Sequence, residues 1–141
     1  MKKPASQAKH KQRMSKVKQQ IDKQIANADK EQGVAVLLTG NGKGKSSSAF
    51  GMLARSLGYG HNCGVVQFIK GDWECGEELF FSQHPLVSYH AMGAGFTWET
   101  QNQAADQAAA ENAWALAARL LADPKIDFLI LDELTYMFSH G

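Results

Sequence analysis

The chain has 141 residues, of which 44% are hydrophobic, a length and composition typical of one globular domain with a buried core. It contains no run of about 18 apolar residues, and its basic N-terminus lacks the apolar segment of a secretory signal. These features exclude a membrane-spanning helix and predict a cytoplasmic protein. The formal net charge is only +1, but it is unevenly distributed.

The N-terminal 30 residues carry nine Lys or Arg residues and two Asp residues, a balance of +7, while the rest of the chain has a balance of −6. Apolar side chains recur there at helical spacing: Met14, Val17, Ile21 and Ile25. This pattern favours a solvated leader helix over a nucleic-acid-binding arm, because residues 16–25 contain no aromatic side chain to stack on bases. We expect residues 1–32 to form this basic helix and residues 33–141 to form the main domain.

Strand and helix patterns alternate along the main domain. Residues 45–58 predict a helix that ends at Gly58, and residues 100–124 predict an alanine-rich helix. Four segments predict strands, the first of them apolar on both faces: residues 33–39, 63–71, 86–93 and 126–134. The fold class is therefore α/β, with a mainly parallel sheet and flanking helices. The last buried strand is expected to end at Asp132, nine residues before the end of the sequence. We therefore expect the chain to be truncated at the C-terminus.

The two cysteines, Cys63 and Cys75, are twelve residues apart and belong to no Cys-x-x-Cys motif or histidine pair. This spacing indicates neither a zinc site nor a disulfide scaffold. We expect both to be reduced thiols.

A glycine-rich segment, TGNGKGKSS at residues 39–47, follows the first apolar run. Its end fits the phosphate-loop pattern Gly-x-x-x-x-Gly-Lys-Ser/Thr, except that Thr39 stands in place of the first glycine. Backbone N–H groups at the start of a helix attract phosphate, and a lysine adds a positive charge, so a flexible surface turn is the weaker interpretation. The predicted nucleotide-binding set is Gly40, Asn41, Gly42, Lys43, Gly44, Lys45, Ser46 and Ser47, with Lys43 equally compatible with an exposed loop lysine.

Two acidic residues, Asp132 and Glu133, directly follow four apolar residues of the last predicted strand. A carboxylate in this position holds magnesium in many nucleotide-binding proteins. Together with the Ser46 hydroxyl, these carboxylates predict a Mg²⁺ site, with Mn²⁺ as an alternative ion. These residues predict a protein that binds a nucleotide with Mg²⁺, but they do not indicate which reaction it catalyses.

Four segments resemble the phosphate-loop family of ATP:corrinoid adenosyltransferases, which act on cob(I)alamin and cob(I)yrinic acid a,c-diamide: TGNGKGKSSSAFG, GVVQFIKG, GFTWETQN and LDELTYM. The likeness runs from about residue 14 to residue 139 and implies a P-loop NTPase-like, RecA-like fold. It also implies transfer of the 5′-deoxyadenosyl group of ATP to Co(I) of a corrinoid, with release of triphosphate, in adenosylcobalamin biosynthesis or corrinoid salvage. No phosphoryl group is transferred in such a reaction.

The resemblance assigns roles to individual residues. It implies that Lys45 stabilises the leaving triphosphate, that Glu133 is a metal partner and that Arg55, one or two turns into the helix after the loop, contacts the nucleotide. It places Phe96 and Trp98 against the corrin ring, where apolar side chains would displace the lower axial ligand of cobalt, although composition alone favours packing aromatics. Ser46 stands where many members have threonine, and residues 71–81 depart from the familiar pattern.

The resemblance further implies a homodimer in which the N-terminal helix acts as a lid over the partner's active site, and its basic face could bind a flavoprotein reductant. Neither a membrane nor a nucleic acid is expected as a partner. Two alternatives from other classes stay open: a small-molecule or nucleoside kinase, and a non-enzymatic nucleotide switch whose basic arm binds nucleic acid. Neither alternative accounts for residues 95–100.

Overall fold

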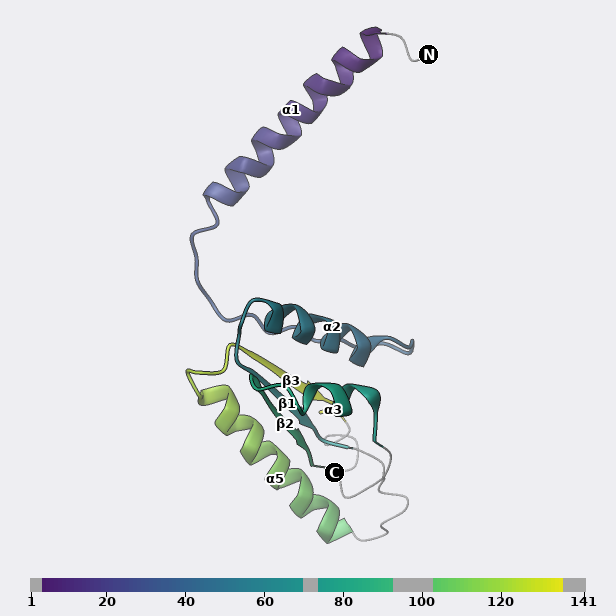
Figure 1. The fold of residues 1–141 in the computed structure, drawn as a ribbon, viewed down its shortest axis with the longest axis vertical. Helices are drawn as coiled ribbons and strands as arrows, with labels where there is room; N and C mark the ends of the chain where they lie inside the picture. The colour runs from purple at the N-terminus through teal and green to yellow at the C-terminus, as the bar shows by residue number, and fades with distance from the viewer. Residues whose placement is uncertain (1–3, 70–73, 93–102, 136–141) are drawn as a thin grey trace. The chain divides into compact units, whose positions relative to one another are not determined.

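The computed structural model describes residues 4–69, 74–92 and 103–135 and divides the chain into two compact units, Met1–Leu37 and Leu38–Gly141. In the first unit, α1 (Pro4–Ala26) is a helix, as the apolar spacing predicts (Figure 1). The apolar side chains of its stripe, from Met14 to Ile25, are exposed. The Lys18 ammonium and the Asp22 carboxylate lie 4.0 Å apart one turn along the helix, a surface pair that contributes little to stability.

The prediction of a strand at residues 33–39 is wrong for this structure. These residues have no regular secondary structure, and their side chains are exposed: 78% for Val34, 63% for Val36 and 78% for Leu37. A segment that is apolar on both faces becomes a strand only when neighbouring strands and covering helices surround it. None of the strand pairs in the described residues includes this segment.

The second unit contains a parallel sheet of three strands in the order β2-β1-β3: β1 (Cys63–Gln67), β2 (Val87–Ala91) and β3 (Phe128–Asp132). The central strand β1 pairs with both neighbours, and Gln67 at its carboxyl end pairs with Ala91 on one side and Asp132 on the other. The carboxyl ends of all three strands therefore meet at one edge of the sheet.

Helices cover both faces of this sheet (Figure 1). On one face, α2 (Lys45–Gly58) and α3 (Gly76–Phe81) supply Phe50, Leu53 and Phe81 to a buried cluster with side chains of all three strands. On the other face, α5 (Gln103–Ala122) supplies Ala113 and Ala117. This confirms the expected α/β class with a parallel sheet and flanking helices.

The helix α2 has the bounds that the sequence predicts, but its C-terminal end differs in detail. Gly58 lies inside the helix, and the glycine with positive φ is Gly60, at 78°. The Tyr59 and Gly60 N–H groups donate to the Ser56 and Leu57 carbonyls at 3.0 and 2.9 Å. The glycine with the left-handed conformation is therefore Gly60, two residues after the end of the helix, and not Gly58.

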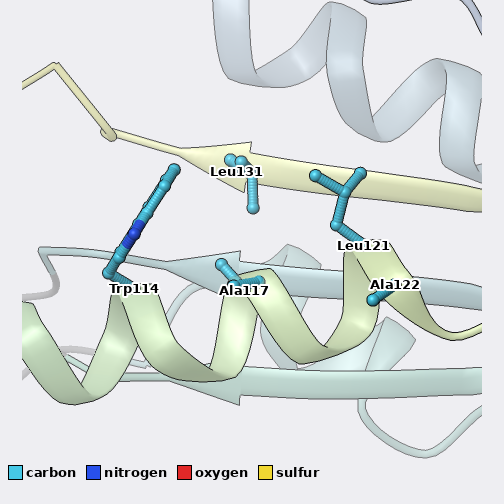
Figure 2. A pocket seen from close by; sticks show the side chains of 6 residues that line it. Trp114, Ala117, Leu121, Ala122 and Leu131 are labelled. Carbon is cyan, nitrogen blue, oxygen red and sulfur yellow. The ribbon is translucent and has the colours of Figure 1, made fainter.

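An apolar hollow of about 190 Å³ lies between α5 and β3 (Figure 2). Trp114 and Leu121 of α5 border it with Leu131 of β3, and both helix side chains are exposed. It lies beside β3, which is an edge strand of the described sheet.

Candidate functional site

The phosphate-loop segment runs through residues 40–44 without regular structure, and α2 begins at Lys45. Gly40 and Gly44 have φ angles of 126° and 103°, a region that only glycine enters readily. Gly44 directly precedes the helix and has no side chain with which to cap it, so the N–H groups of the first helical turn can face a ligand. The loop thus has the backbone geometry of an anion-binding turn.

The Lys45 side chain folds back over this loop. Its Nζ atom donates hydrogen bonds to the Gly40 and Gly42 carbonyls at 2.9 and 2.8 Å. An ammonium group has three protons, so one remains for a ligand while both bonds persist. The positive charge of Lys45 is therefore held against the backbone of the loop, at Gly40 and Gly42.

Ser46, in the first turn of α2, contacts the end of β3. Its hydroxyl donates a hydrogen bond to Asp132 Oδ1 at 3.1 Å, across 86 residues of sequence. Ser46 at the end of the phosphate-loop pattern and the strand-end carboxylate of Asp132, which the sequence predicts to share one site, are therefore in direct contact. Glu133 follows with φ of 59°, an unusual value for a residue with a side chain, and is exposed at the turn after the strand.

Two residues of this site were missed by the sequence analysis, Gln67 and Tyr89. Gln67 Nε2 donates to Asp132 Oδ2 at 3.2 Å, and the Tyr89 hydroxyl donates to Gln67 Oε1 at 2.9 Å. Burial, followed by the charges of Cys75, Glu78 and Asp132, raises the pKa of Tyr89 above its usual value. The signal that could have found them is their place in strands whose carboxyl ends meet beside Asp132.

The remaining residues of the predicted site do not belong to this hydrogen-bonded group around Asp132. Asn41, Lys43 and Ser47 are exposed in or beside the loop. Arg55 lies in the last turn of α2, nearly three turns and about 15 Å along the helix from Lys45, which is farther than the one or two turns expected. Phe96 and Trp98 lie outside the described residues.

The Ser46 and Asp132 oxygens are ligands of the kind that Mg²⁺ prefers. Because the Ser46 proton points to Asp132, the lone pairs of the hydroxyl remain for a cation. Within residues 4–69, 74–92 and 103–135, no three His, Cys, Asp or Glu side chains are grouped so that they could hold a metal ion by themselves. A cation here would therefore depend on phosphate oxygens and water for most of its ligands, which is usual for Mg²⁺.

A glycine-rich turn that leads into a helix, beside a carboxylate at the end of a parallel strand, is the arrangement typical of phosphate-loop nucleotide-binding proteins of the α/β class. A sequence profile of the ATP:corrinoid adenosyltransferase family BtuR/CobO/CobP matches residues 31–141. The chain belongs to this family. None of the helices in the part of the chain that the structure describes is long and apolar enough to cross a membrane.

Proteins similar to this chain include three named as corrinoid adenosyltransferases. The protein of Pseudomonas aeruginosa is 55% identical over 98% of this chain and 68% of its own length. Those of Salmonella typhimurium and Escherichia coli K12 are 49% and 45% identical, each over 96% of this chain and 68% of their own length. The likeness therefore covers the loop, the sheet and the strand-end carboxylates together.

Proposed function

We propose that this protein transfers the 5′-deoxyadenosyl group of ATP to Co(I) of a corrinoid and releases triphosphate. One observation carries the proposal: the family match spans both the loop and the strand-end carboxylate, and these two parts meet in the Ser46–Asp132 hydrogen bond. The similar proteins named as corrinoid adenosyltransferases support the same reaction over a kinase or a nucleotide switch.

In this reaction negative charge develops on the leaving triphosphate. An electron pair of Co(I) forms the bond to the 5′ carbon of the ribose, and the bond from that carbon to the triphosphate oxygen breaks with its electron pair on oxygen. Hydrogen-bond donors that already face the triphosphate stabilise this growing negative charge. The N–H groups of residues 40–46 and the Lys45 ammonium, held by the Gly40 and Gly42 carbonyls, are suited to this role.

Ser46 and Asp132 would hold Mg²⁺, with the exposed Glu133 as a third candidate and Mn²⁺ as the alternative ion. The ion would add positive charge to neutralise the triphosphate. This proposal is supported by the position of Ser46 in the first turn of α2 and of Asp132 at the end of β3, which pairs with β1. Asn41, Lys43, Ser47 and Arg55 are proposed as further nucleotide contacts, and Phe96 and Trp98 as contacts to the corrin ring.

We further propose that α1, within residues 1–32, packs on a second copy of the chain and covers its nucleotide site. The exposed apolar stripe of α1 supports this, because burial of such a stripe against a partner is energetically favourable. A flavoprotein reductant binding to the basic face, and location in the cytoplasm, belong to the same proposal.

The test is incubation of the protein with ATP, Mg²⁺ and chemically reduced cobalamin or cobyrinic acid diamide. We expect a light-sensitive cobalt–carbon product together with inorganic triphosphate in equal amount. Adenosine diphosphate among the products would instead indicate a kinase. Salt-sensitive binding of RNA or DNA, with no corrinoid product, would indicate the switch.

A further inference from the structure

We propose that Gln67 and Tyr89 are positioning residues that hold the Asp132 carboxylate in the orientation needed to bind a divalent cation beside the phosphate loop. The inference rests on the proposed function for the identity of that site. Neither side chain need contact the nucleotide or the corrinoid.

The first step of the argument is that both oxygens of Asp132 are engaged. Oδ1 accepts from the Ser46 hydroxyl at 3.1 Å and Oδ2 accepts from Gln67 Nε2 at 3.2 Å. A carboxylate held on one oxygen alone can rotate about its last bond, because that torsion has broad minima. Gln67 therefore supplies the second point that fixes the plane of the carboxylate.

The second step concerns the orientation of the Gln67 amide, which is only 7% exposed. If the amide were flipped, Oε1 would face Asp132 Oδ2, and two acceptors would lie against each other without a proton. The Tyr89 hydroxyl, which donates to Oε1 at 2.9 Å, favours the orientation in which Nε2 faces the carboxylate. A hydrogen bond to a charged group is worth more than one between neutral groups, so the flipped state is the weaker one.

The third step is that the Tyr89 ring is itself held by the helix that carries Ser46. It stacks on Phe50 of α2, with ring centroids 6.4 Å apart and planes 11° apart. Phe50 in turn stacks on Phe81 of α3 at 5.6 Å. The contacts thus form a closed path from Ser46 through Asp132, Gln67 and Tyr89 back to α2.

The parallel register explains why these residues meet. Gln67 pairs with Asp132, and Val65 pairs with Tyr89. Alternation along each strand places Val65, Gln67, Tyr89 and Asp132 on the face that α2 covers, as the shared cluster of Val65, Tyr89 and Phe50 indicates. Tyr89 lies two residues before the end of β2, and its long side chain reaches the amide at the strand ends.

The experiment measures Mn²⁺ binding in the presence of ATP by electron paramagnetic resonance, and ATP binding without metal by calorimetry. Loss of a partner that orients a metal ligand typically weakens metal binding about 10- to 100-fold. We expect about tenfold or more for Gln67→Leu. A smaller loss, about three- to tenfold, is expected for Tyr89→Phe, which keeps the ring and its stacking and removes only the hydroxyl. Metal-free ATP affinity should stay within about twofold of the wild type, because the loop and Lys45 are untouched.

Matched controls remove the same groups elsewhere. Tyr59→Phe removes an exposed phenol at the far end of α2, and Gln83→Leu removes an exposed amide that donates to the Leu79 carbonyl at 2.9 Å. Both should bind Mn²⁺ as the wild type does. In the transfer assay, saturating Mn²⁺ should restore kcat in Tyr89→Phe, a rescue that a merely structural defect would not show.

Wild-type Mn²⁺ affinity in a folded Tyr89→Phe variant and in Gln67→Leu would overturn the inference. So would an equal loss of metal-free ATP binding, which would mean that the loop itself is disturbed. If the wild type forms no cobalt–carbon product but the variants still weaken Mn²⁺ binding, the proposed function fails and the positioning role stands.

Discussion

Replacement of Gly44 by alanine tests whether the backbone of the phosphate loop is set for its ligand. Gly44 has φ of 103°, and an added Cβ atom would meet no atom within 4 Å apart from those of Gly44 itself and its neighbours along the chain. The cost of Gly44→Ala is therefore backbone strain alone, about 1–2 kcal/mol for an L-residue with positive φ. Overlap with more distant residues does not add to this cost.

This strain must appear in one of two measurements. If the free loop relaxes to avoid it, nucleotide binding has to restore the original backbone, and ATP affinity falls by about 5- to 30-fold. If the loop keeps its conformation, the same free energy is lost from the stability of the fold. Calorimetric titration with ATP and Mg²⁺, together with thermal unfolding, should recover a total of about 1–2 kcal/mol.

The matched control is Gly42→Ala. Gly42 also has open space around an added Cβ, but its φ is not positive. Any gain from stiffening the unfolded chain, about 0.4–1 kcal/mol, is shared by the two variants and cancels in the comparison. If Gly44→Ala matched Gly42→Ala in both affinity and stability, the interpretation of the loop as a prearranged anion site would be wrong.

Four further outcomes are expected. Lys45→Ala should weaken ATP binding by at least about tenfold in calorimetry, because it removes the charge that the Gly40 and Gly42 carbonyls hold over the loop. Burial, and then the charge of Asp127, raises the pKa of Cys63 from 9.0 to about 11. The unfolded chain therefore loses this proton first, stability falls by at most about 3 kcal/mol between pH 9 and pH 11, and denaturant titrations should show a smaller fall for Cys63→Ala. Phe96→Ala and Trp98→Ala should slow turnover with cob(II)alamin and a reductant, and unchanged rates would refute their corrin contact. Ile21→Asp, on the exposed stripe of α1, should shift any dimer toward monomer in light scattering, whereas an unchanged mass would count against packing of α1 on a second copy.

Local patterns predicted the elements that depend on local physics. The helix of α2 has its predicted bounds, and the loop before it has the glycines that its positive φ angles require. The segment at residues 33–39 has an equally clear apolar pattern and yet forms no strand. A helix makes its hydrogen bonds within itself, whereas a strand needs a partner that its own sequence does not contain. That difference explains why the first prediction is confirmed and the second is wrong.

The environment of Asp132 depends on strand order, which no local pattern states. If the strands lay in the order of the sequence, β3 would pair with β2, and Asp132 would end beside Ala91. In the observed order, β3 pairs with β1 instead, and Asp132 ends beside Gln67. A buried amide donor then meets the carboxylate where otherwise only a methyl group would lie. The strand-end carboxylate could therefore be predicted from the sequence as a cation ligand, but the residues that orient it follow only from the crossover that brings β3 to the other side of β1.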